Sequence, residues 1–332
     1  MTNAWMIYTH GDPLKTMRQL LFDLWQQAEL QGMLLPVYQE GETETTPRIV
    51  ESKDLLQVAD PCVPLMPINA SKLVVDYARE HPQGRFGAVL RSCEERALTE
   101  IARREELDLK NWLIISVDCL ASYPEDDFEW RVQKAGSVEQ LTQENLGHAR
   151  QGGIALHRFR HACQMCTSPQ ASQGDVLVCL LGLPVKHVLL VQAKDDATAR
   201  KLNLDQITDG EAPPALIAQH EKTVNILVER RTRTLEHMIR DLNESLPQDV
   251  EELITHLQNC APCRECLDVC PIYSFEIAQA GSEPVSNREA AVRWLVSCVS
   301  CGMCEQACPN HLPLTAIISR ISRELKFELT PA

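Results

Sequence analysis

The chain has 332 residues, of which 44% are hydrophobic and 23% charged, a composition typical of a globular protein of about two domains. Lys and Arg number 32 and Asp and Glu number 46, so the formal net charge is −14. This charge argues against nucleic acid as the main ligand and against electrostatic docking on anionic lipid. No apolar run approaches the roughly 18 residues of a transmembrane helix, and residues 1–6 lack the pattern of a signal peptide. We therefore predict a cytoplasmic protein, where clustered cysteines bind metal more often than they form disulfides.

The first two thirds of the chain alternate helical and strand-like patterns. Helical spacing of apolar residues begins near Pro13 and ends before Gly32, and Ser71 is placed to cap a second helix. Alternation of strands and helices predicts an α/β fold, with a mixed or parallel sheet and flanking helices. The expected helices cover residues 14–30, 71–79 and 94–106, and the expected strands cover residues 86–90, 112–117, 176–183 and 187–191.

From about residue 213 the pattern becomes helical. A long helix is expected over residues 216–246, with Pro247 ending it, and Arg230, Arg231 and Arg233 are expected on its exposed face. Asp249 is placed to cap the next helix. We therefore predict an α/β domain, a helical linker, and an α-helical ferredoxin-like domain, over residues 1–212, 213–248 and 249–332 respectively.

Eight of the 14 cysteines lie between residues 260 and 308. They form the run Cys-x2-Cys-x2-Cys-x3-Cys-Pro twice, at residues 260–271 and 298–309. This run binds 4Fe–4S clusters in two-cluster ferredoxins, where its fourth cysteine ligates the other cluster. Zinc sites use two Cys or Cys/His pairs for each ion, so zinc matches the doubled run poorly. We predict two 4Fe–4S clusters, one held by Cys260, Cys263, Cys266 and Cys308, the other by Cys298, Cys301, Cys304 and Cys270.

Four further cysteines lie beside the expected strands: Cys93, Cys119, Cys163 and Cys166. Loops that follow the carboxyl ends of parallel strands meet at one rim of a sheet, so these four thiolates would complete one more 4Fe–4S site. The alternative is that they are simply buried free cysteines, and spacing alone does not separate the two. Cys179, inside an apolar strand, is expected in the core, and the role of Cys62 stays open.

These motifs resemble those of the β subunits of deazaflavin-linked hydrogenases and formate dehydrogenases, over most of the chain. Residues 86–98 resemble that family's strand, turn, Cys and helix, residues 114–119 its second strand ending in Cys, and residues 161–167 its CxxC loop. Residues 293–314 closely resemble the two-cluster tail of the formate dehydrogenase members. The resemblance implies that a third 4Fe–4S cluster, beside a flavin, is bound by Cys93, Cys119, Cys163 and Cys166.

The chain departs from this family where the family has glycines. Residues 14–18 replace a Gly-Gly-Val-Val-Thr-like run, residues 90–93 replace a Gly-Thr-Pro-Cys turn, and the apolar residues 176–185 replace a glycine-rich segment. Glycines of this kind let the backbone approach a flavin and its phosphates. We therefore expect the FAD site of the family to be lost or weakened here.

The resemblance implies an iron–sulfur electron-transfer subunit of a multisubunit oxidoreductase, a formate dehydrogenase, that relays single electrons between a catalytic subunit and a redox partner. No catalytic residue is predicted in this chain. The alternative is an FAD-containing subunit that exchanges a hydride with a flavin, a deazaflavin or a similar carrier, or the β subunit of a hydrogenase. Expected partners are the catalytic subunit of a formate dehydrogenase or hydrogenase and other iron–sulfur or flavin subunits. Such partners would also allow peripheral attachment to a membrane complex.

Overall fold

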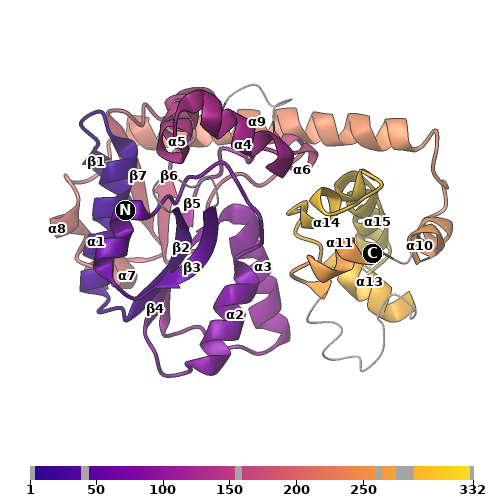
Figure 1. Ribbon diagram of the computed structural model, residues 1–332, viewed down its shortest axis with the longest axis horizontal. Coiled ribbons are helices and arrows are strands. Elements are labelled where there is room, and N and C mark those ends of the chain that lie inside the picture. Colours follow the sequence, from indigo (N-terminus) through magenta and orange to yellow (C-terminus); the bar gives the residue numbers. More distant parts are fainter. Residues whose placement is uncertain are drawn as a thin grey trace.

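The computed structural model describes residues 4–38, 45–153, 159–258, 260, 263–273 and 288–329. Figure 1 shows an α/β body beside a smaller group of helices formed by the end of the chain, with one long helix lying along both. Among the described residues, none of the helices combines the length and apolar character that crossing a bilayer requires.

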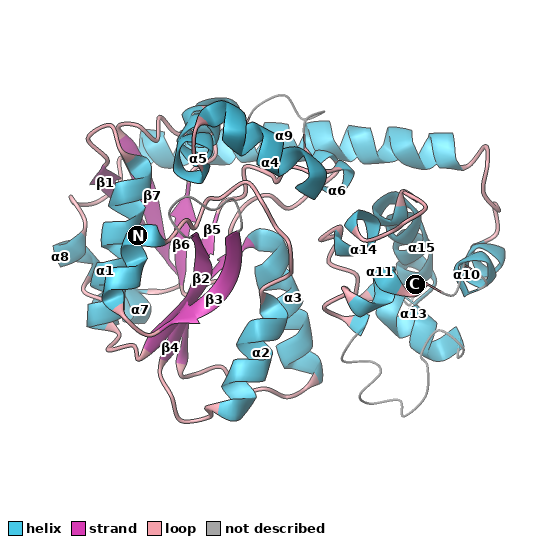
Figure 2. Ribbon diagram, viewed as in Figure 1, coloured by secondary structure: helices cyan, strands magenta, loops and turns pink. Residues whose placement is uncertain are grey.

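The body is built on one seven-stranded mixed sheet, drawn in magenta in Figure 2. The four central strands β6, β5, β4 and β2 run parallel, while β7 and β1 at one edge and β3 at the other pair antiparallel. In spatial order the strands are β1 (Ala4–Tyr8), β7 (Val188–Ala193), β6 (Val176–Cys179), β5 (Trp112–Val117), β4 (Phe86–Arg91), β2 (Gly32–Tyr38) and β3 (Thr45–Val50).

Helices cover both faces of this sheet, because successive side chains of a strand point to opposite sides. On β2, Met33 and Leu35 pack into the cluster that contains helix α1, whereas Leu34 packs into the cluster that contains α2 and α3. The helical elements of the body are α1 (Pro13–Gln27), η1 (Lys53–Val58), α2 (Ser71–Glu80), α3 (Ser92–Arg104), α4 (Glu125–Ala135), α5 (Val138–Gly147), η2 (Ala149–Gln151), α6 (His161–Gln164), α7 (Asp196–Lys201) and α8 (Leu204–Ile207).

The long helix α9 (Pro214–Leu242) joins the two parts. Its first half contributes Val224 and Leu227 to the core of the body, and Leu235 near its end packs with Met165 of the body and Ala316 of the tail. The described tail elements are all helices: α10 (Val250–Gln258), α11 (Glu265–Asp268), α13 (Arg288–Val296), α14 (Met303–Gln306) and α15 (Leu314–Leu329). An all-α class for the whole tail, and the predicted domain limits, stay predictions.

Most predicted elements are present, with bounds shifted by a few residues. The expected strand over residues 176–183 ends at Cys179, where the chain turns. Ser71 is not a cap, because α2 is preceded by Ala70 and the Ser71 hydroxyl donates instead to Asn69 Oδ1. Asp249 does cap α10, accepting from the backbone N–H of Glu252 at 3.0 Å.

Candidate iron–sulfur sites

The structure brings the four scattered cysteines of the body together at one rim of the sheet. Cys93 lies in the first turn of α3, directly after β4, and Cys119 follows the end of the parallel neighbour β5. The other two lie on and just after α6, which Figure 1 shows beneath α9 on the side of the body that faces the tail. All four line a single cavity; we call Cys93, Cys119, Cys163 and Cys166 the body set.

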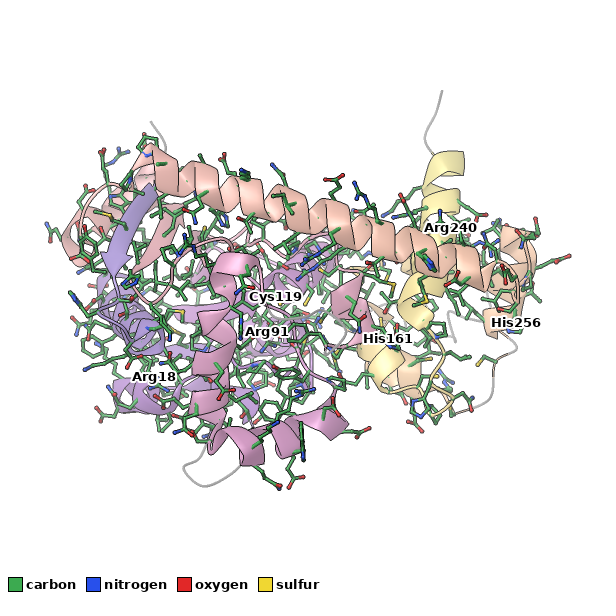
Figure 3. The ribbon with its side chains drawn as sticks, turned by 90° about the horizontal axis from the view of Figure 1, so that it is seen from above. Arg18, Arg91, Cys119, His161, Arg240 and His256 are labelled. Carbon is green, nitrogen blue, oxygen red and sulfur yellow. The ribbon has the colours of Figure 1, made fainter. Side chains whose placement is uncertain are left out.

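Hydrogen bonds hold the loops that carry the body set. The Arg91 guanidinium donates to the carbonyls of Val63 and Leu65, and the Arg91 backbone N–H donates to Glu94, which fixes the start of α3. The Cys119 N–H donates to the carbonyl of Pro169, three residues beyond the CxxC pair. Figure 3 shows Arg91 and Cys119 in the middle of the molecule.

Buried Asp118, next to Cys119, ties two loop segments to the end of β5. Its carboxylate accepts from the backbone N–H groups of Ala171, Leu180 and Leu181 at 2.8–3.0 Å. Burial raises the pKa of Asp118, and His220 beside it opposes that shift. We infer that Asp118 positions two segments near the body set: the loop around Ala171, which follows the CxxC pair, and the turn at Leu180 and Leu181, which follows β6.

Asp118, Cys179 and His220 also approach one another, with ligand atoms within 4.8 Å. His220 Nδ1 lies 2.9 Å from the carbonyl of Leu181, so it carries the proton and donates. Because Nδ1 is engaged in this way and Asp118 already accepts three backbone hydrogen bonds, the cluster is a hydrogen-bonded support of the loops rather than an open metal site.

Three buried arginines line the cavity of the body set: Arg91, which is 3.9 Å from Glu94, and Arg160 and Arg231. Arg160 is 7% exposed and Arg231 only 1% exposed, and both line the cavity. Within the described part of the chain, Nε of Arg160 and both Nε and Nη2 of Arg231 have no hydrogen-bond acceptor. A buried, unpaired cation is costly, and a cluster ligated by four thiolates is an anion that would balance it. The cavity therefore fits a 4Fe–4S cluster in charge as well as in ligands.

In the tail, cysteines from the two runs lie near one another in two groups. In the charge environment of Cys266 the neighbouring thiols are Cys308, Cys260 and Cys263, and these four line one cavity of about 430 Å³. In the charge environment of Cys304 the neighbouring thiols are Cys298, Cys301 and Cys270. We call Cys260, Cys263, Cys266 and Cys308 the outer set, and Cys270, Cys298, Cys301 and Cys304 the inner set.

Three thiols, one from each set, are poor free nucleophiles but suitable metal ligands: Cys119, Cys266 and Cys298. Burial raises the pKa of Cys266 to about 11 and that of Cys298 to about 12, and it also raises the pKa of Cys119. Without metal these groups are therefore protonated at neutral pH, and metal binding would displace the protons. N–H groups already point at two sulfurs of the inner set: Trp294 Nε1 donates to Cys270 Sγ, and the Ser300 N–H donates to Cys298 Sγ, both at 3.4 Å.

The body set and the inner set adjoin each other. Cys93 and Cys301 belong to one small buried cluster together with Met66 and Met303. Arg96 links the same two regions, because its guanidinium donates to the carbonyls of Ser168 at 3.0 Å and Val299 at 2.8 Å. The inner set in turn adjoins the outer set, since Cys304 lines the outer cavity.

The remaining residues singled out in the sequence lie apart from the cysteine sets, with one exception. Cys179 is in the core as expected; Cys62 packs on Met17 with the two sulfurs 3.5 Å apart, it is not among the residues that line the cavity of the body set, and Cys119 lies in its charge environment. The exception is Arg231, whose expected exposure was wrong: α9 turns this residue inward against the cavity, while Arg230 and Arg233 do lie on the exposed face. Sequence reasoning missed Arg160, which lies on an irregular segment before α6 with no periodic pattern to place it.

Comparison with known proteins agrees with this chemistry. Residues 256–312 match the family of 4Fe-4S dicluster domains, so the chain is an iron–sulfur protein. It is 21% identical over 324 residues to the F420-dependent formate dehydrogenase subunit beta of Methanocaldococcus jannaschii, an alignment that covers 84% of this chain and 80% of that relative. The resemblance to such β subunits is thereby confirmed over most of the chain.

Two further matches are more limited. The chain is 28% identical over 125 residues to the acetyl-CoA decarbonylase/synthase complex subunit alpha 1 of Methanosarcina mazei, which covers 37% of this chain and 15% of that protein. A chain in the structure of the F420-reducing [NiFe] hydrogenase complex from Methanosarcina barkeri aligns with a TM-score of 0.47 and 10% identity, over 71% of this chain and 91% of that one.

Proposed function

We propose that this chain is the electron-transfer subunit of a multisubunit oxidoreductase of the formate dehydrogenase type. It would relay single electrons between a catalytic subunit and a redox partner. The observation that carries this proposal is the row of three adjoining cysteine sets, which runs from the rim of the sheet through the inner set to the outer set. The similarity to a formate dehydrogenase β subunit over 84% of the chain supports the choice of complex.

The proposed ligands are the three cysteine sets, each holding one 4Fe–4S cluster. When bound, such clusters take up and release single electrons at potentials that ligation, hydrogen bonds and burial adjust. The protein supplies the thiolates, the N–H groups of Trp294 and Ser300 that point at sulfur, and the buried charges of Arg160 and Arg231. No protein side chain is assigned a bond-making step.

The two ends of the row differ in exposure, which suggests where a partner would dock. Cys260 and Cys263 of the outer set are exposed, whereas Cys93 and Cys163 of the body set are buried. Electron transfer to another protein requires close approach to a cluster, so we assign the surface around Cys260 and Cys263 to a redox partner.

We further propose that the chain works without FAD at the position its family uses. The segment after β6 fills the core: Leu180, Leu181 and Leu183 are fully buried. The one glycine of residues 180–183, Gly182, packs against Thr223 of α9. A side chain at this position would collide with Thr223, so the glycine is explained by helix packing. The backbone N–H groups of residues 180–183 all donate to other groups of the protein, so we propose that this segment does not bind a flavin phosphate.

The test is anaerobic purification of the chain with its native partners, followed by stepwise reduction and acid extraction of cofactor. We expect a catalytic subunit in the complex, uptake of electrons in one-electron steps by this chain, and no FAD bound to it. Stoichiometric FAD on this chain would establish the alternative, a flavin-containing oxidoreductase subunit. A chain that purifies without companions and accepts no electrons would contradict the relay.

A further inference from the structure

Arg160 lies between two of the cysteine sets. Its Nη2 atom is 3.7 Å from Cys163 Sγ of the body set and 3.4 Å from the carbonyl oxygen of Cys301 in the inner set. Nη1 donates to Gln306 Oε1 at 3.0 Å, which holds the guanidinium toward the tail. Arg160 is therefore a residue of the α/β body whose side chain contacts both the body set and the inner set.

The surroundings of this guanidinium strengthen its electrostatic interaction with nearby charges. It lies among the thioethers of Met66 and Met303 and is 7% exposed, so little water screens it. In a poorly polarisable interior, charges interact more strongly than in water. Among the described residues, no carboxylate forms an ion pair with Arg160 within 4 Å, so its charge is left for the thiolates.

We propose that Arg160 sets the reduction potentials of two clusters at once, the one held by the body set and the one held by the inner set. This inference rests on the proposed function, because it requires clusters in both sets. Reduction adds one electron to a cluster without breaking a cysteine ligand, so each reduced state carries one more negative charge. A fixed cation beside both sets stabilises both reduced states, so it raises both reduction potentials.

Arg231 offers an internal comparison on the same cavity. It lines the same cavity, which Cys301 of the inner set also lines, but among the described residues its Nε and Nη2 atoms have no hydrogen-bond acceptor, whereas Arg160 reaches the carbonyl of Cys301. Removal of the Arg231 charge should therefore act mainly on the body-set cluster, and removal of the Arg160 charge should act on both clusters. Arg233, on the same helix and 73% exposed in its side chain, should affect neither.

The experiment is a redox titration of the full, iron-loaded chain, with each cluster followed by its EPR signal, for Arg160→Gln, Arg160→Lys, Arg231→Gln and Arg233→Gln. In Arg160→Gln we expect the reduction equilibrium of both clusters to weaken about tenfold, which is a shift of 59 mV for a one-electron couple. Arg160→Lys should restore most of the shift, Arg231→Gln should lower the potential of the body-set cluster more than that of the inner-set cluster, and Arg233→Gln should match the wild type. Unchanged potentials in Arg160→Gln at full iron content would overturn the inference.

A second variant covers the case in which Arg160→Gln loses iron. Gln306→Glu keeps the arginine but places a negative charge 3.0 Å from it, so both potentials should again fall. If neither variant lowers both potentials, Arg160 only holds the two parts together and the inference is wrong. Failure of the proposed function is visible separately: a wild-type chain with about eight irons rather than about twelve has no cluster in the body set.

Discussion

Gly302, the residue after Cys301, packs directly against Ala162, the residue before Cys163. Through this pair the backbone beside the inner set meets the methyl side chain of a residue beside the body set. Gly302 has a φ of +74°, and a Cβ built on it would collide with Ala162 Cβ. The close approach of the two proposed clusters therefore depends on a residue without a side chain.

Gly302→Ala is expected to separate the tail from the body. The new methyl group both strains the backbone and pushes against Ala162, so the chain should unfold at lower temperature and electron exchange between the two sets should slow. Gly210→Ala is the matched control, because Gly210 has a φ of +113° but open space around it. That control measures the cost of an alanine at a positive φ without the collision. Equal effects of the two substitutions would argue against the packing explanation.

Cys301→Ser is expected to remove the inner-set cluster and to damage the tail around it. The described tail elements are short helices around cysteines, and metal ligation contributes directly to the stability of such a domain. Iron content and the EPR spectrum of the reduced protein measure the loss. A variant with unchanged iron and an unchanged reduced spectrum would exclude Cys301 as a ligand.

Asp118→Asn is expected to impair the body set while leaving the tail loaded. The amide has one oxygen instead of two acceptors, so it cannot keep all three backbone hydrogen bonds to Ala171, Leu180 and Leu181. We expect a loss of about four irons per chain, with the tail signals retained. Full iron content in a folded variant would show that the carboxylate is dispensable for the loops.

Asp60 should make stability depend on pH. Burial raises the pKa of Asp60 from 3.8 to about 6, against the opposing hydrogen bonds from Thr142 and the Cys62 N–H. Between these values the unfolded chain has released the proton that the folded chain keeps, so the free energy of unfolding should fall as pH rises from about 4 to about 6. The full effect is on the order of 3 kcal/mol.

Chemical denaturation at a series of pH values measures this slope. Asp60→Asn has no proton to release, so its stability should lack the decrease over this range. The same decrease in the variant would assign the pH dependence to another group.

The cysteine sets of the tail could be proposed from the sequence because the ligands of such clusters recur at fixed spacings along the chain. The doubled run of residues 260–308 encodes its interleaved ligand sets in spacing alone. The body set is spread over residues 93–166, so spacing left it undecided, and only the meeting of β4, β5 and α6 at one rim brings it together.

The missed features depend on tertiary contacts. The edge hairpin of β2 and β3 was not predicted, because each strand contains a proline, a residue that argues against a strand; Pro36 and Pro47 face each other in its register. Arg231 was expected on a wet face, because periodicity identifies the faces of α9 but not which partner covers them. No sequence pattern marks Arg160, because its surroundings depend on how the tail packs against the body.

The central claim is that the chain holds three clusters in three cysteine sets, and the iron content of anaerobically purified protein tests it most directly. We expect about twelve irons per chain in the wild type, about eight in Cys119→Ser, and about twelve in Cys62→Ser, whose cysteine is partly buried but outside the sets. About eight irons in both the wild type and Cys119→Ser would contradict the account, because the body set would then hold no cluster.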